Sequence, residues 1–287
     1  MRLFLFLLLS LPGVSVSAGA QQAVPGAVAD VLLNSDWMYY EVASMLPEEL
    51  EQDVPIRVNL PHSWNTFDAT DDSPGYRRDA SWYRKQLTFD REAGQYRHFL
   101  YFEGANMRAE VYVNGKHAGG HVGGYLGFEI EITDLIDFTG INDIAVRVDN
   151  SVDRSLIPSQ TADFVLFGGL TRDVYLQVRP DIHIDSIQVD TPEVTPGRAR
   201  VRSKVFLNGR ESEPREYHIE LKIMNEEQET VSRARQAVAA GAAGSSHEFE
   251  LPAIDNPALW SPGSPSLYTL EVTLSNPSGD VVHEMSE

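Results

Sequence analysis

Apolar and polar residues alternate with a period of two along most of this chain. The alternation is clearest at residues 96–102, 109–113, 143–148 and 174–178, and a half-buried β-strand produces this period. Segments with the period of a helix are scarce, and Gly, Pro, Asn and Asp separate the strand-like runs. The pattern therefore predicts an all-β fold of short antiparallel strands, in which sandwiches are favoured over β-α-β units.

Asn-Gly dipeptides end two of the predicted strands. Asn114-Gly115 follows residues 109–113 directly, and Asn-Gly favours a two-residue hairpin because both residues tolerate positive φ. The same dipeptide recurs at Asn208-Gly209, again between strand-like runs. The first of these predicts a tight hairpin.

A domain boundary is expected near residues 179–181. A closing strand precedes it, and a second alternating series begins at residues 182–189. Further strand-like runs follow at residues 198–207, 217–224, 230–237, 246–251 and 267–274. Residues 237–246 are mostly small and predict either a loop or a loosely packed entry into a strand. Six or seven short strands in about 107 residues is the strand density of an immunoglobulin-like sandwich.

The first twenty residues have the features of a secretory signal peptide. A charged start precedes an apolar run at residues 3–11, and Ala18-Gly19-Ala20 has the small-residue pattern of a cleavage site. The apolar run is too short to span a bilayer, which takes about 20 residues. We therefore expect cleavage after Ala20 and an exported protein, either secreted or in a bacterial periplasm, with no membrane association of the mature chain.

Composition excludes several classes of function. The 287 residues contain 42 acidic and 23 basic side chains, a formal net charge of −19, and no cysteine. The absence of cysteine excludes thiol catalysis, disulfides and Cys-ligated metal sites. The negative charge disfavours nucleic-acid binding, and the histidines are too scattered to predict a metal site. No metal or other cofactor is expected.

Several motifs follow one another in a fixed order. They are LNSDW at residues 33–37, LPHSWN at 60–65, SWYRK at 81–85, YVNG at 112–115, DFVLFGGLTRDV at 163–174 and LWSP at 259–262. This order and spacing resemble the amino-terminal half of glycoside hydrolase family 2, and within it the β-galactosidase branch. The resemblance covers residues 30–287, and the ordered set is far more specific than any single motif.

The resemblance implies a domain plan. A jelly-roll, galactose-binding-like sandwich is expected at residues 21–180 and an immunoglobulin-like β-sandwich at residues 181–287. In complete members, a (β/α)₈ barrel with both catalytic glutamates comes next. The chain ends at Glu287, about where that barrel would begin, so we expect the barrel to be absent. Retaining hydrolysis needs two carboxyl groups about 5–5.5 Å apart. We therefore predict no catalytic residue in this chain and no hydrolysis by it alone.

One substrate-binding residue is implied by the resemblance. In the β-galactosidase branch, an aspartate six residues before the glycine of the closing turn reaches the sugar subsite, and Asp163 matches that position relative to Gly169. An ionised carboxylate accepts charge-assisted hydrogen bonds from sugar hydroxyls. The alternative is that Asp163 caps a turn before a strand at residues 164–167.

Other polar and aromatic candidates favour structural roles. A polar loop precedes Trp82, and its members either face the same cleft or are simply solvated: Asp71, Asp72, Tyr76, Arg77, Arg78 and Asp79. Trp64 and Trp82 are interpreted as core residues rather than as sugar-stacking platforms. Asn225-Glu226 resembles the family's catalytic Asn-Glu pair but lies in a polar run typical of a solvated turn.

Three hypotheses follow. The first is the non-catalytic portion of an exported family 2 exo-β-glycosidase, with a β-galactoside or related neutral glycoside as its ligand. A downstream catalytic barrel and further copies of the chain in a homo-oligomer would be its partners. The second is a free-standing carbohydrate-binding or adhesion module, and the third is a purely structural pair of sandwiches. In the absence of a barrel, exposed apolar docking faces would make the chain prone to aggregation.

Overall fold

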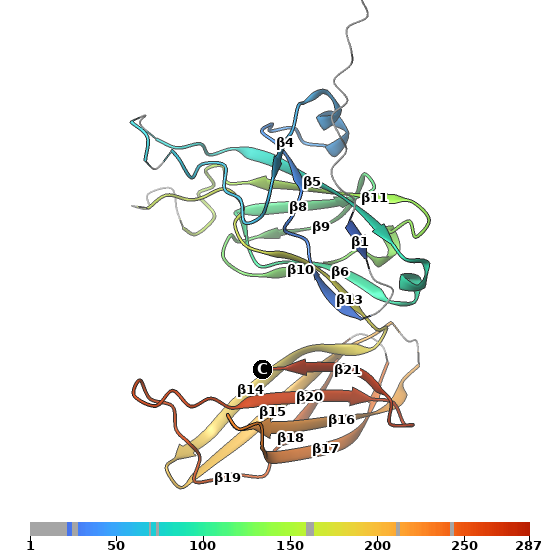
Figure 1. The fold of residues 1–287 in the computed structure, drawn as a ribbon, viewed down its shortest axis with the longest axis vertical. Coiled ribbons are helices and arrows are strands. Elements are labelled where there is room, and N and C mark those ends of the chain that lie inside the picture. The colour runs from blue at the N-terminus through green and yellow to red at the C-terminus, as the bar shows by residue number, and fades with distance from the viewer. Residues whose placement is uncertain are drawn as a thin grey trace, which may run out of the picture.

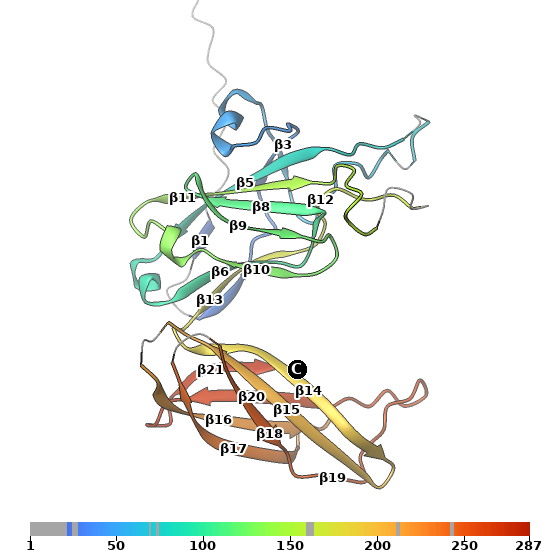
Figure 2. The ribbon, with the colours of Figure 1, turned by 180° about the vertical axis from the view of Figure 1, so that it is seen from behind.

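The computed structural model describes residues 22–24, 28–68, 70–72, 75–158, 164–210, 213–241 and 244–287. These residues form two β-sandwiches that follow one another along the chain (Figures 1 and 2). The helices in this part of the chain are three short 3₁₀ turns: η1 (Pro47–Gln52), η2 (Arg91–Gln95) and η3 (Thr133–Leu135). The predicted fold class, a jelly-roll-type sandwich followed by an immunoglobulin-like one, is confirmed.

The first sandwich contains thirteen strands. They are β1 (Gln22–Val24), β2 (Ala29–Leu32), β3 (Trp37–Tyr40), β4 (Ile56–Val58), β5 (Ala80–Phe89), β6 (Arg97–Phe102), β7 (Ala105–Asn106), β8 (Arg108–Val113), β9 (Lys116–Val122), β10 (Phe128–Glu131), β11 (Ile141–Asp149), β12 (Gly169–Leu170) and β13 (Val174–Arg179). One sheet has the order β4-β3-β5-β11-β8-β9, and β1 pairs with β5 in parallel. The opposing sheet has the order β10-β6-β13-β2, and β12 pairs with β7.

Alternating burial along these strands builds the core of the first sandwich. In β13 the side chains of Val174, Leu176 and Val178 are buried and the residues between them are not. Each fully buried aliphatic or aromatic side chain contributes about 1.5–3 kcal/mol of transfer free energy. Trp37 and Trp82 are fully buried, so Trp82 is confirmed as a core residue.

The second sandwich contains eight strands. They are β14 (His183–Thr195), β15 (Arg198–Asn208), β16 (Arg215–Met224), β17 (Thr230–Ala240), β18 (Ser245–Glu250), β19 (Ile254–Asp255), β20 (Thr269–Ser275) and β21 (Val281–Ser286). One sheet has the order β14-β15-β18, with β19 also pairing with β15, and the other has the order β17-β16-β20-β21. A separate apolar core lies between the two sheets.

Charged side chains join the two sandwiches. Arg97 is 5% exposed, and its guanidinium donates to Glu131 at 3.0 and 2.7 Å and to Asn208 Oδ1 of the second sandwich at 3.1 Å. Arg210 of the second sandwich donates to Asp134 of the first at 2.9 and 3.1 Å. A guanidinium that forms several hydrogen bonds to carboxylates fixes direction as well as distance, so these bonds orient one sandwich against the other.

The structure confirms one local prediction and corrects two others. Asn114 and Gly115 have φ of 53° and 75° and close the β8–β9 hairpin, in which Val113 pairs with Lys116. The strand predicted at residues 164–167 is wrong, because this segment is irregular and leads into β12. The strand predicted at residues 230–237 is too short, since β17 continues to Ala240, which pairs with Arg215 of β16.

In the part of the chain that the structure describes, no helix has the length and hydrophobicity needed to cross a bilayer.

Candidate functional site

The candidate site lies at one end of the first sandwich. Asp163 itself lies outside the described residues, but the structure describes the chain on both sides of it, up to residue 158 and from residue 164. These flanks and the loop between β4 and β5 project to the same side of the molecule (Figure 1).

Two buried asparagines hold the segment that follows Asp163. Asn65 Nδ2 donates to Leu166 O at 3.0 Å and to Arg77 O at 3.1 Å, while Asn65 Oδ1 accepts from Gly168 N at 3.0 Å. Asn150 Nδ2 donates to the same Leu166 O at 3.0 Å. Both asparagine side chains are fully buried. An irregular segment cannot satisfy its own backbone groups, and these two amides satisfy them instead.

Two glycines let this segment pass close to its neighbours. A Cβ on Gly168 would lie 2.2 Å from Trp64 Cζ2, so no larger residue fits without moving the indole. Gly169 has φ of +133°, a conformation open almost only to glycine, and a Cβ there would lie 2.3 Å from His62 O. The two glycines of the closing turn are therefore required by packing and by backbone conformation.

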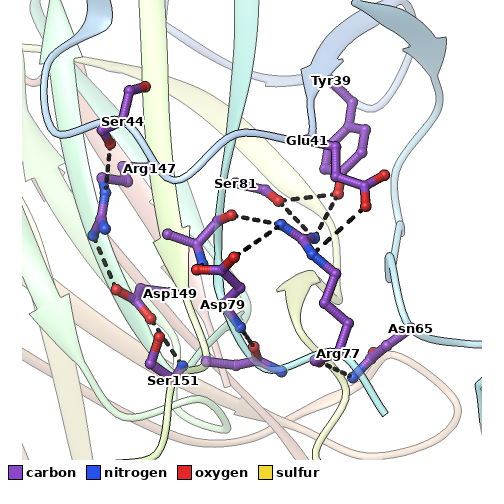
Figure 3. Close-up of polar contacts among 12 residues, drawn as sticks. Tyr39, Glu41, Ser44, Asn65, Arg77, Asp79, Ser81, Arg147, Asp149 and Ser151 are labelled. Carbon is purple, nitrogen blue, oxygen red and sulfur yellow. Dashed lines mark hydrogen bonds and ion pairs between the residues drawn. The ribbon is translucent and has the colours of Figure 1, made fainter.

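Arg77 ties the β4–β5 loop to the sheet beneath it (Figure 3). Its guanidinium donates to Ser81 Oγ at 2.9 Å, Ala80 O at 2.8 Å and Tyr39 Oη at 3.1 Å, and lies 3.6 Å from Glu41. Its Cζ also lies 5.2 Å from the centre of the half-buried Trp64 ring, within cation–π range. Because these groups occupy the guanidinium, Arg77 positions the loop rather than offering a free charge to a ligand.

Neighbouring loop residues are similarly engaged. Arg78 Nε donates to Asn150 O at 2.9 Å, and Asp79 N donates to Asn150 Oδ1 at 2.9 Å. Arg147 donates to Ser44 O at 3.0 Å and to Asp149, two residues further along the same strand β11, at 3.1 Å (Figure 3). The polar loop is thus hydrogen-bonded directly to Asn150 and, through Asn65, to Leu166. A simple solvated loop would lack these bonds.

Burial changes the ionisation of groups beneath the closing turn. His62 Nδ1 lies 2.8 Å from Tyr83 Oη. Burial lowers the pKa of His62 and raises the pKa of Tyr83 well above its ordinary value. Burial also raises the pKa of Tyr39, despite its hydrogen bonds to Ser81 and Arg77. At neutral pH these groups are therefore uncharged, and they hold the turn through a neutral hydrogen-bond network.

Three large apolar side chains are exposed on these loops. Phe67 is 81% exposed, Phe164 52% and Ile157 90%. Large apolar side chains at such exposure, gathered on loops at one end of a sandwich, are typical of a surface that meets another protein surface or a ligand. Among the described residues, no group of three or more His, Cys, Asp or Glu side chains is arranged to hold a metal ion.

Asn225-Glu226, a candidate from the sequence, has a structural role, and so has Asp173. Asn225 Oδ1 accepts from Glu229 N at 2.8 Å, which closes a turn between β16 and β17, and Glu226 accepts from Leu267 N at 3.2 Å. Asp173 accepts from Asn34 Nδ2 at 2.8 Å, so it joins β13 to the segment between β2 and β3.

The sequence did not reveal Asn65 and Asn150 as the residues that hold the closing turn. They lie 101 and 16 positions from the carbonyl they share, and no local pattern connects them. The LPHSWN motif, which ends at Asn65, was a signal of the family resemblance, but it did not indicate what the Asn65 side chain binds.

Comparison with known proteins gives the family. Residues 22–180 match the model for the glycosyl hydrolases family 2 sugar binding domain, and residues 182–287 match a second glycosyl hydrolases family 2 model. The chain is 40% identical over 251 residues to a Formosa agariphila protein named "Putative beta-glucuronidase", covering 87% of this chain and 30% of that protein. It is 30% identical to a Thermoanaerobacter pseudethanolicus β-galactosidase, covering 85% of this chain and 33% of that one.

Solved structures agree. The crystal structure of Bacteroides uniformis β-glucuronidase superposes with a TM-score of 0.84 at 25% identity, over 91% of this chain and 32% of that one. The chain thus spans about a third of the length of the curated relatives it matches. Each of the two sandwiches matches a family 2 model, and the chain belongs to glycoside hydrolase family 2.

Proposed function

We propose that this chain is the amino-terminal, sugar-binding and sandwich portion of an exported exo-β-glycosidase, and that it hydrolyses nothing by itself. The observation that carries the proposal is the match of both sandwiches to family 2 models over about a third of the relatives' length. The remaining two thirds of such a relative is where a catalytic barrel with its two carboxyl groups belongs.

The first sandwich contributes to the sugar subsite through Asp163. Residues 164–168, which follow it in the chain, are held through Leu166 O and Gly168 N by Asn65 and Asn150. A carboxylate at that position accepts hydrogen bonds from two sugar hydroxyls and distinguishes their orientation. The exposed Phe67 and Phe164 on the same loops supply apolar surface for the catalytic domain.

The substrate proposed is a β-galactoside or a related neutral glycoside. A net charge of −19 disfavours an anionic substrate at long range. A β-glucuronide is the second candidate, because relatives at 40% and 36% identity carry glucuronidase names. The apolar run and Ala18-Gly19-Ala20 at the amino terminus support export to the periplasm or beyond, with cleavage after Ala20.

The experiment uses an extended protein, in which Glu287 is joined to the part of the Formosa agariphila relative that follows its matched region. We expect this protein to hydrolyse nitrophenyl β-glycosides, and Asp163→Ala to lower kcat/KM by about 10- to 100-fold, the effect of losing hydrogen bonds to a charged group. Asp72→Ala, which removes an exposed carboxylate of the neighbouring loop, is the matched control and should leave kcat/KM unchanged.

An extended protein that binds and hydrolyses equally well with Asp163→Ala would refute the role of Asp163. Galactose-dependent tryptophan fluorescence of the unextended chain would instead favour the free-standing binding module, which needs no barrel. The nucleotide sequence after the Glu287 codon distinguishes the glycosidase from the free-standing binding module. A family 2 barrel encoded there would support the glycosidase.

A further inference from the structure

The second sandwich has an open apolar groove at the end farthest from the first sandwich. The groove has a volume of about 440 Å³, and six of its lining residues are Val189, Val194, Ala199, Trp260, Leu267 and Tyr268. That volume is within the range of sites that accept several side chains or a small ligand. Its walls are formed by β14 on one side and by the segment between β19 and β20 on the other.

The groove is an uncovered part of the sandwich core. Val189 pairs with Ser203 and Val194 pairs with Ala199, and directly opposed residues in an antiparallel pair point to the same face. Ser203 and Ala199 are buried on the inner face of β15, yet Val189 is 47% exposed and Val194 52% exposed. These two valines therefore point inward over a space that no strand of the opposing sheet fills.

The opposite wall is also exposed. Trp260 is 60% exposed and Leu267 is 67% exposed. Side chains of this size lose about 1.5–3 kcal/mol each when they remain in water instead of being buried. Four large apolar residues exposed around one hollow form a surface that favours an apolar occupant, and Glu287 is the one charged residue among those that line it.

The described chain ends in this groove. The backbone of Glu287 pairs with that of Leu270 in both directions, at 2.8 and 3.0 Å, so the ladder between β20 and β21 continues to the last residue. Figure 1 shows the C-terminus beside β14 and β20. Any residues that follow Glu287 would begin between Tyr268 and the inner face of β14.

We infer that the residues following Glu287 in the complete enzyme extend β21 along Leu267 and Tyr268 and close the groove with apolar side chains. This inference rests on the proposed function in one respect, that a catalytic domain follows the second sandwich. The first segment of that domain is thus part of the core of the second sandwich. The two domains are joined by shared packing, not by a free linker.

Hydroxyl-radical footprinting of the extended protein and of residues 1–287 tests this inference. We expect oxidation of Trp260 and Leu267 to fall several-fold in the extended protein. Oxidation of Met45, which is 64% exposed in the first sandwich, should remain the same and serves as the internal reference. Equal oxidation of Trp260 in the two proteins overturns the inference, even when the extended protein is an active glycosidase.

A substitution gives a second readout. Leu267→Asp should lower the midpoint of thermal unfolding in the extended protein, and it should change little in residues 1–287, where Leu267 lies in water. Val281→Asp is the matched control, because Val281 is 58% exposed in the same sandwich and does not line the groove. An equal effect of Leu267→Asp in the two proteins contradicts the inference.

A shorter extension covers the case in which the full extension does not fold. It adds to Glu287 only about six residues of the relative, the length of an ordinary strand. Trp37 and Trp82 are fully buried, Trp64 is half-buried and Trp260 is 60% exposed, so Trp260 is the tryptophan most open to acrylamide, and Trp260→Phe identifies its share of the quenching. We expect the extension to reduce quenching of Trp260, and unchanged quenching refutes the closing of the groove.

Discussion

Removal of the Asn65 side chain tests whether the closing turn is held as described. In Asn65→Ala, Leu166 O keeps its hydrogen bond from Asn150, but Gly168 N and Arg77 O lose their partner. A buried polar group left without a partner costs about 1–3 kcal/mol, so two such groups give about 2–6 kcal/mol. With an m-value of about 2–3 kcal/mol/M, the urea midpoint should fall by roughly 1–3 M.

The assay separates the first sandwich from the second. Trp37, Trp64 and Trp82 belong to the first sandwich and Trp260 to the second, so in a Trp260→Phe background the change of tryptophan fluorescence in urea reports unfolding of the first sandwich alone. Hydrogen exchange measured by mass spectrometry should also become faster at residues 164–170. Asn59→Ala is the control, since Asn59 is exposed and its Oδ1 accepts a hydrogen bond from Asp36 N in an exposed setting. If Asn65→Ala costs no more than Asn59→Ala, the closing turn is not held by Asn65.

Three further predictions concern packing, the junction between the sandwiches and pH. Gly168→Ala should cost about 1–3 kcal/mol, because its Cβ overlaps Trp64, whereas Gly197→Ala, with open space around it, should leave the thermal midpoint nearly unchanged. Arg97→Gln should separate the calorimetric unfolding of the two sandwiches, because it removes the guanidinium that bonds Glu131 and Asn208; a single unchanged transition argues against that role. Burial lowers the pKa of His183 and of His283 to about 4. The unfolded chain therefore binds protons first, and stability falls as pH drops from about 6.5 to about 4, by up to about 3 kcal/mol per histidine. Urea unfolding at neutral and acid pH checks this, and His283→Gln should reduce the dependence.

The fold could be predicted from the sequence because burial along the strands alternates with a period of two, as the apolar and polar residues do. In β8, Ala109, Val111 and Val113 are buried and the residues between them are less so, as the pattern requires. The hairpin at Asn114 and Gly115 was equally readable, because positive φ at both positions is a local requirement. The family resemblance added the order of the two sandwiches.

The site could be predicted only in outline. The role of Asn65 depends on a carbonyl 101 residues away, and such a contact exists only after the sheets have packed. Residues 164–167 carry a strand-like apolar run, but they form no strand because Asn65 and Asn150 take the hydrogen bonds that a neighbouring strand would supply. The open groove could not be predicted for the same reason, since Trp260 and Val194 line the same groove only in the folded sandwich.

The most direct measurement is the rate at which purified residues 1–287 hydrolyse nitrophenyl β-galactoside and nitrophenyl β-glucuronide, beside the extended protein in the same assay. We predict no release of nitrophenol above the buffer blank from residues 1–287, and turnover of at least one substrate by the extended protein. Turnover by residues 1–287 alone, lost neither on further purification nor on repeated preparation, would contradict the proposal that both catalytic carboxyl groups lie outside this chain.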